Sequence, residues 1–159
     1  MKLGLVLREL HRAETALAKD LLKTSDRHHA EHEVHHVARD LAAWSAAHVR
    51  DIARAGRAYD LELGEDVPGP GPLEPLRRAL AELSGRRPEP GLLLLADLRR
   101  LHRRAAGVSL DWELLAQSAQ AAKDTGLLEL ATRCHPQTLR QLKWTNAMLK
   151  VLSPQILTS

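Results

Sequence analysis

The chain begins, over residues 3–23, with LGLVLRELHRAETALAKDLLK, in which leucines recur at alternating steps of three and four. This spacing puts the leucines on one face of a helix, because an α-helix completes a turn in about 3.6 residues. One place in the series belongs to Glu14, which has leucines on either side. A carboxylate in an apolar stripe is costly unless it is paired, protonated or bound to a metal. Residues 3–23 therefore predict a helix with one chemically informative residue on its buried face.

A second helix is predicted directly after the first. Residues 24–26, Thr-Ser-Asp, offer side-chain oxygens that suit a turn and a helix N-cap. Apolar or aromatic residues then recur with helical spacing up to Gly56, and we expect the helix to fray near Tyr59. The stripe consists of Val34, Val37, Leu41, Trp44, His48, Ile52 and Ala55. So short a connection predicts that the two helices are antiparallel neighbours.

Proline and glycine mark a long crossover in the middle of the chain. Residues 64–72, GEDVPGPGP, cannot form a helix and are predicted to be a linker. A second break follows at residues 85–91, GRRPEPG, and between the two breaks residues 73–83 predict a short helix. We interpret residues 64–91 as an insert on a crossover, within one domain that covers residues 1–159.

Two further helical regions are predicted after the crossover. The first begins near Leu92, stops near Gly107 and restarts after Ser109, a good N-cap, so we expect it to be broken or bent. The last runs from Leu127 to about Leu152, with an interruption at Pro136, and ends at residues 153–154, Ser-Pro. The prediction is an all-α, antiparallel four-helix bundle whose long crossover carries a short extra helix.

Composition agrees with this fold class and excludes several functions. The chain has 159 residues, 3% aromatic residues and no Phe, so its core must consist of Leu and Ala. A single cysteine, Cys134, excludes an internal disulfide and favours a reducing compartment. The apolar runs are too short for a signal peptide or a bilayer span, so we expect a cytoplasmic protein without a membrane partner. A net charge of +3 with interspersed signs gives no indication of specific nucleic-acid binding.

The order of elements and three sequence segments resemble the ferritin-like superfamily of helical bundles, particularly its bacterial members. The segments are RAETALA (12–18), EVHHVARDLAAWSAAH (33–48) and QLKW (141–144). The resemblance implies a ferritin-like bundle with a role in metal handling or stress. It also implies metal ions in the bundle core, held by one Glu on each of two helices and by Glu-x-x-His on each of the other two.

Glu14, Glu33 and His36 are the candidate metal ligands. Glu33 and His36 have the Glu-x-x-His spacing, which puts both on one helix face. A turn near Asp26 would bring residues 36–40 beside Glu14 and would leave His48 about 15 Å further along, a poor partner. Carboxylate and imidazole ligands suit Fe, Mn or Zn. No Glu-x-x-His occurs in the second half of the chain, although Asp97, His102, Cys134 and His135 offer ligand atoms there. A complete dinuclear site is therefore not expected.

Structural explanations exist for the same residues. Glu14 would be equally satisfied by a buried pair with Arg39, His36 or Arg12. The five histidines between His28 and His36 suit a solvated helix start. His48 and His102 are expected at the edge of the core, bonded to a carbonyl or a carboxylate. The remaining aromatic and sulfur side chains suit the core itself, namely Trp44, Trp112, Trp144 and Cys134.

The sequence leaves the question of enzymatic activity open. It contains no glycine-rich phosphate loop and no Ser, His and acid arrangement, so metal chemistry is the one route that the residues suggest. Three functions remain: a metal-binding ferritin-like protein, an interaction bundle with a degenerate metal site, and a bundle with a small-ligand pocket. Val6 and Leu22 would contribute to the surface of an interaction bundle. Polar groups such as Asn146 would line a small-ligand pocket. We expect a homodimer more than a monomer, because dimers are the commonest oligomers.

Overall fold

The computed structural model describes residues 2–85 and 89–159, and helices form nearly all the regular structure of these residues. The elements in chain order are α1 (Leu3–Arg27), α2 (His32–Gly56), the 3₁₀ turn η1 (Arg57–Tyr59), α3 (Glu74–Leu83), α4 (Pro90–Ala121) and α5 (Thr125–Leu157). The all-α prediction and the predicted helix on the crossover are confirmed.

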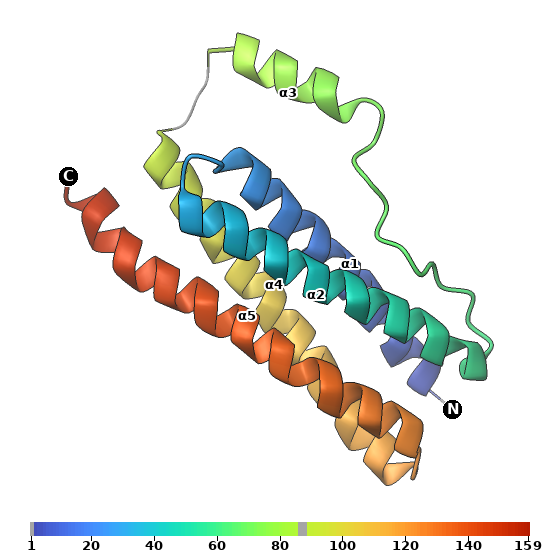
Figure 1. Cartoon of the computed structure of the whole chain (residues 1–159). Coiled ribbons are helices and arrows are strands. Elements are labelled where there is room, and N and C mark those ends of the chain that lie inside the picture. The colour runs from blue at the N-terminus through green and yellow to red at the C-terminus, as the bar shows by residue number, and fades with distance from the viewer. Residues whose placement is uncertain (1, 86–88) are drawn as a thin grey trace.

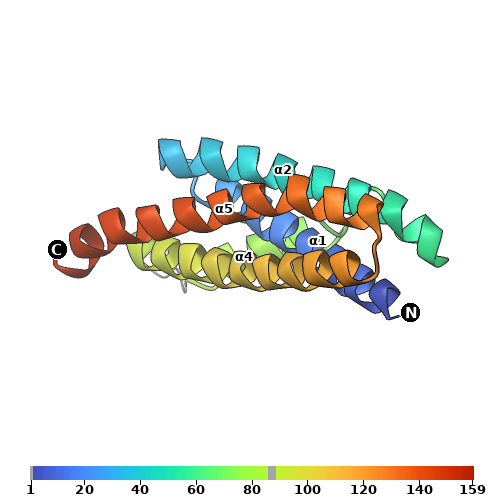
Figure 2. The same ribbon diagram turned by 90° about the horizontal axis from the view of Figure 1, so that it is seen from below.

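Four long helices, α1, α2, α4 and α5, lie side by side (Figures 1 and 2). Helix α1 packs against both α2 and α4, and α5 packs closely against α4 and more loosely against α2. The connections between α1 and α2 and between α4 and α5 are short, so the members of each pair are antiparallel, as predicted. Within the described residues, α3 packs along none of the four and stands outside the bundle (Figure 1).

Leucine dominates the core, as the composition predicts. The leucine stripe of α1 is buried along its length, and Trp112 on α4 is fully buried among these side chains. Val6 packs against the core, whereas Leu22 remains 43% exposed. In the part of the chain that the structure describes, no helix has both the length and the apolarity needed to cross a bilayer.

The connection between α1 and α2 lies later in the chain than predicted. Helix α1 continues through residues 24–26 to Arg27, and α2 begins at His32. Ser25 does not cap a helix, because its hydroxyl donates to the backbone oxygen of His35 at 2.6 Å. His35 returns a bond from Nδ1 to the carbonyl of Ser25 at 2.8 Å. The polar residues that resemble a cap therefore join two packed helices, and the predicted turn was wrong.

The predicted break in the third long helix was also wrong. Helix α4 is continuous from Pro90 to Ala121. Gly107 is exposed, and a glycine inside a helix costs only about 1 kcal/mol relative to alanine. Ala105, Val108 and Trp112 are buried on one face on either side of it, and this packing outweighs the cost of the glycine.

Helix α5 likewise passes through both of its prolines. It begins at Thr125, where the side chain of Asp124 accepts from the N–H of Leu127 at 3.0 Å, and it ends at Leu157 rather than near Leu152. Pro136 is exposed, while Cys134 and Thr138 on either side of it are buried. Burial of the continuous face therefore overrides the helix-breaking tendency of proline.

Candidate functional site

A buried polar centre lies where the four long helices meet. Glu14 on α1 is fully buried, as its place in the leucine stripe predicts. Its Oε1 accepts a hydrogen bond from the indole N–H of Trp112 on α4 at 3.3 Å. Its Oε2 lies 3.2 Å from Nδ1 of His48 on α2. On its other side, His48 Nε2 lies 2.7 Å from Oε1 of Gln137 on α5. One side chain from each long helix therefore contributes to a single chain of hydrogen bonds.

Both ring nitrogens of His48 lie within hydrogen-bond distance of a side-chain oxygen. The Gln137 oxygen only accepts, so His48 Nε2 carries a proton, and a carboxylate at Glu14 requires a second proton on Nδ1. Burial alone would lower the pKa of His48, but the hydrogen bond and the charge of Glu14, aided by Gln137 and Asp51, raise it above its usual value of 6.5. The raised pKa of His48 favours an imidazolium beside the buried carboxyl group of Glu14.

The partner of Glu14 differs from the one that the sequence suggested. A connection at residues 28–31 lies about four residues later than a turn near Asp26, and this delay moves the residue opposite Glu14 by about eight positions along α2. The residue opposite is therefore His48, which was wrongly judged a poor partner. The separate expectation that His48 bonds a carbonyl or a neighbouring carboxylate is confirmed, because its Nδ1 lies 3.2 Å from Glu14 Oε2.

Glu33 and His36 do not meet Glu14. Both are exposed near the start of α2, and the ring of His36 lies 4.5 Å from that of His32 and 5.0 Å from that of His35. Arg39, a proposed partner of Glu14, is exposed as well, and Arg12 pairs with Glu9. Of the five clustered histidines, His29, His32 and His36 are exposed, as expected of a solvated helix start.

The other candidate ligands of the second half of the chain also have protein partners. His102 Nδ1 lies 2.8 Å from Thr145 Oγ1, and His135 Nε2 lies 2.8 Å from Ser109 Oγ. Cys134 is buried, as predicted, and burial raises the pKa of its thiol to about 12. Within residues 2–85 and 89–159, no cluster of three or more His, Cys, Asp or Glu side chains has metal-binding geometry.

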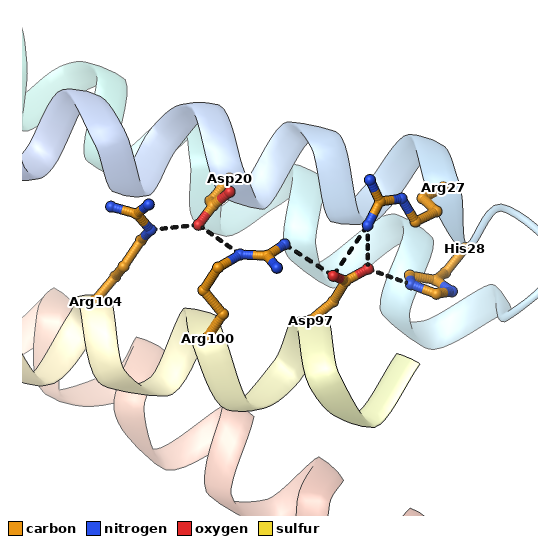
Figure 3. Close-up of polar contacts among 6 residues, drawn as sticks. All are labelled: Asp20, Arg27, His28, Asp97, Arg100 and Arg104. Atoms are coloured by element: carbon orange, nitrogen blue, oxygen red, sulfur yellow. Dashed lines mark hydrogen bonds and ion pairs between the residues drawn. The ribbon is translucent and has the colours of Figure 1, made fainter. Parts of the chain in front are cut away.

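A second polar cluster joins α1 to α4 near the α1–α2 connection (Figure 3). Asp97 is only 1% exposed, and three cationic or ionisable side chains surround it. His28 Nε2 lies 2.7 Å from it, Arg100 Nη2 donates at 2.8 Å, and Arg27 Nη1 donates to both of its oxygens at 3.1 Å. Burial opposes ionisation of Asp97, but the bond from His28 and the charges of Arg27 and Arg100 lower its pKa.

The ion pairs continue from Asp97 along α1. Arg100 Nε also donates to Asp20 at 3.2 Å, and Arg104 Nε lies 2.5 Å from the same carboxylate oxygen of Asp20 (Figure 3). Charges of alternating sign thus follow one another along the seam between α1 and α4. This network fixes the register of two helices that are far apart in the sequence.

The seam between α2 and α5 is also polar. Gln141 on α5 is buried, and its Nε2 donates to Ser45 Oγ at 2.9 Å and to the carbonyl of Leu41 at 3.0 Å. Among the described residues, Oε1 of Gln141 and the hydroxyl of Thr138 have no hydrogen-bond partner. Asn146, the polar residue suggested for a ligand pocket, is exposed instead. The polar groups inside the bundle are therefore not the ones that the sequence indicated.

Sequence reasoning did not find Trp112 or Gln137 as members of the centre. Trp112 was correctly expected in the core, but nothing in a helical pattern reveals which buried carboxylate an indole N–H will reach. Gln137 follows Pro136 and is only half-buried, so its spacing carries no signal. The one usable signal was that Glu14 and His48 both interrupt apolar stripes on neighbouring helices.

Comparison of the chain with known protein families, with curated proteins and with solved structures finds no match.

Proposed function

We propose that this protein is a non-catalytic helical bundle that acts by associating with another protein surface, and that its polar centre is a structural ion pair in place of a metal site. The observation that favours association is the exposure of large apolar side chains on α3, such as Leu76 and Leu80. The observation that favours a structural role for the centre is the pairing of Glu14. Both carboxylate oxygens have protein donors or an imidazolium beside them, so the buried charge is compensated without a ligand.

Spacing on α2 and α4 supports a degenerate metal site. The pattern implied by the ferritin-like resemblance has Glu three residues before His on a core helix. On α2 the residue three before His48 is Ser45, whose hydroxyl accepts from Gln141. On α4, Trp112 contacts Glu14 where that pattern would supply another carboxylate. The protein would thus retain the bundle and one Glu and one His of such a site, with neutral residues elsewhere.

The residues present do not fit a bound Fe, Mn or Zn ion at Glu14. The predicted ligands Glu33 and His36 are exposed and do not contact Glu14. Both oxygens of Glu14 and both ring nitrogens of His48 already lie within hydrogen-bond distance of protein atoms. We therefore derive no metal chemistry from this centre. The metal-binding role inferred from the sequence stays a prediction, and the experiment below tests it directly.

The test is metal content by mass spectrometry on untagged protein purified without chelator, as wild type and as the double variant Glu14→Leu, His48→Leu. We expect well below one metal ion per chain in both proteins, and the same unfolding temperature with and without chelator. A second variant, Glu33→Ala with His36→Ala, serves as the control for the exposed histidine-rich start of α2.

One metal ion per chain that disappears in the Glu14→Leu, His48→Leu variant would refute the structural reading of the centre. A metal ion that disappears only in the Glu33→Ala, His36→Ala variant would place a site on the surface of α2 and would leave the ion pair intact. Either metal result would favour the metal-binding function over the interaction function.

A further inference from the structure

Helix α3 carries a leucine face that nothing in the described structure covers. Leucines stand at the residue before the helix and along it with spacings of three, four and three: Leu73, Leu76, Leu80 and Leu83. Their exposed fractions are 66%, 57%, 57% and 82%. Alternating steps of three and four are the spacing with which helices pack on other helices. The face thus has the pattern of a helix–helix contact but lacks a partner within this chain.

The orientation of α3 keeps this face away from the bundle. A cleft of about 810 Å³ separates α3 from the end of α1 and the start of α4. On the α3 side, the cleft is lined by the four charged residues of the helix and by one alanine: Glu74, Arg77, Arg78, Glu82 and Ala81. The helix therefore turns its polar side toward the bundle and its leucines outward. Its ribbon stands apart from the four long helices (Figure 1).

Other exposed apolar side chains gather at the same end of the molecule. Of the twelve large apolar side chains that are exposed among the described residues, three belong to α3 and Leu73 directly precedes it. Four more lie near the end of α1, the start of α4 or the end of α5. These four are Leu22, Leu92, Val151 and Leu157. Figure 1 shows that these helix ends and α3 share one end of the bundle.

Area and charge favour a second copy of this chain as the occupant. The four leucines of this face are each more than half exposed, so a contact between two copies would bury roughly 1,000 Å² of their surface in total, which is about the smallest area of a specific interface. The polar side of α3 carries two acidic and two basic residues, Glu74, Glu82, Arg77 and Arg78, so α3 adds no net charge. A neutral helix of this length lacks the basic excess that holds amphipathic helices to anionic lipid, and two copies of it do not repel each other through net charge.

We propose that α3 is a dimerisation helix, and that two copies of the chain associate through the leucine face of α3. A two-fold axis would place the same face of each copy against the other. This inference rests on the proposed role in protein association and names the partner surface.

The test measures molar mass by light scattering and sedimentation over a range of protein concentrations. The variant is Leu76→Glu with Leu80→Glu. Its matched control is Leu110→Glu with Leu114→Glu on the outer face of α4, because both pairs have the same residue type, the same spacing of four, and similar exposed fractions of 57% and 57% against 67% and 58%.

We expect a wild-type dimer, a control variant that dimerises equally well, and an α3 variant whose dissociation constant rises roughly 30-fold or more. Circular dichroism checks folding, and we expect the α3 variant to fold because these leucines lie outside the core clusters. A wild type that stays monomeric would overturn the proposal, as would an α3 variant that dimerises normally or a control that dissociates. Leucine-dependent binding of a monomer to anionic phospholipid vesicles would identify a membrane as the occupant instead.

These outcomes are separable from those of the metal experiment. A monomer that contains no metal would refute the dimerisation helix but would remain consistent with association with another protein. A dimer that holds one metal ion at Glu14 would refute the proposed structural role of the polar centre and would support the dimerisation helix.

Discussion

A buried carboxylate at residue 14 is stable because each of its oxygens has a partner from a different helix. The charges of Glu14 and His48 attract each other strongly in a water-poor interior, and Trp112 adds a donor that cannot change its charge. Removal of either charged partner leaves the other without compensation. Such pairs cost much to break and little to replace as a whole with apolar residues.

A double-mutant cycle tests this description of the centre. His48→Leu leaves the Glu14 carboxylate buried with only the indole donor, so we expect the free energy of unfolding to fall by about 3–5 kcal/mol. The double variant Glu14→Leu, His48→Leu removes both charges, and we expect it to recover most of this loss. Urea unfolding measures both values. The single variant Glu14→Leu completes the cycle, and a loss in the double variant equal to the sum of the two single losses would show that the ion pair contributes no coupling.

The site was predictable from sequence only in part. The burial of Glu14 followed from its place between leucines, and a carbonyl or carboxylate partner for His48 was expected from its place in the stripe of α2. Their pairing was not predictable, because each residue of error in the position of the α1–α2 connection moves the opposite residue by about two. Buried Ser25, which bonds His35, resembles a helix cap in sequence, and this likeness produced the error.

At the scale of elements, the apolar stripes predicted where the helices lie. The helix-breaking residues, glycine and proline, were a poorer guide to where the helices end. Helix α4 passes Gly107 and α5 passes Pro136, because continuous buried faces outweigh the local cost of these residues. Where no such face packs on the bundle, residues 64–72 form no helix, as predicted from their glycines and prolines. Glycine and proline therefore interrupt helices in this chain only where tertiary packing does not stabilise a continuous helix.

Two glycines of α4 provide a prediction at this scale. A Cβ atom at Gly107 would meet nothing within 4 Å, so we expect Gly107→Ala to raise the free energy of unfolding by about 1 kcal/mol through higher helix propensity. At Gly91 the Cβ would lie 2.9 Å from Ile156 Cγ2, so Gly91→Ala should gain less or destabilise. Thermal unfolding compares the two variants. A larger gain at Gly91 than at Gly107 would contradict the close approach of α5 to the start of α4.

At the scale of the whole molecule, two polar clusters set the register of the bundle while the crossover remains outside it. The Asp97 network fixes α1 against α4, and the Glu14 centre connects all four long helices. Leucine stripes alone permit helices to slide by a turn, whereas buried charges permit one alignment. The molecule thus combines a bundle of defined register with α3, whose leucine face is free for association.

These two clusters predict how stability depends on pH. The pKa of Asp97 is lowered on folding, so its contribution is present above its usual value of 3.8 and is lost as the pH falls through the folded-state pKa. The pKa of His48 is raised on folding, so its contribution is complete below 6.5 and is lost as the pH rises through the folded-state pKa. We therefore expect the free energy of unfolding to be highest between about pH 4 and 6.5. Urea unfolding across pH 3–9 measures this profile. In the variant Glu14→Leu, His48→Leu, the decline in stability on the alkaline side should disappear. In Asp97→Asn, part of the decline on the acid side should disappear. A wild-type profile that rises from pH 6.5 to pH 8 would contradict the protonated state of His48 and with it the buried ion pair.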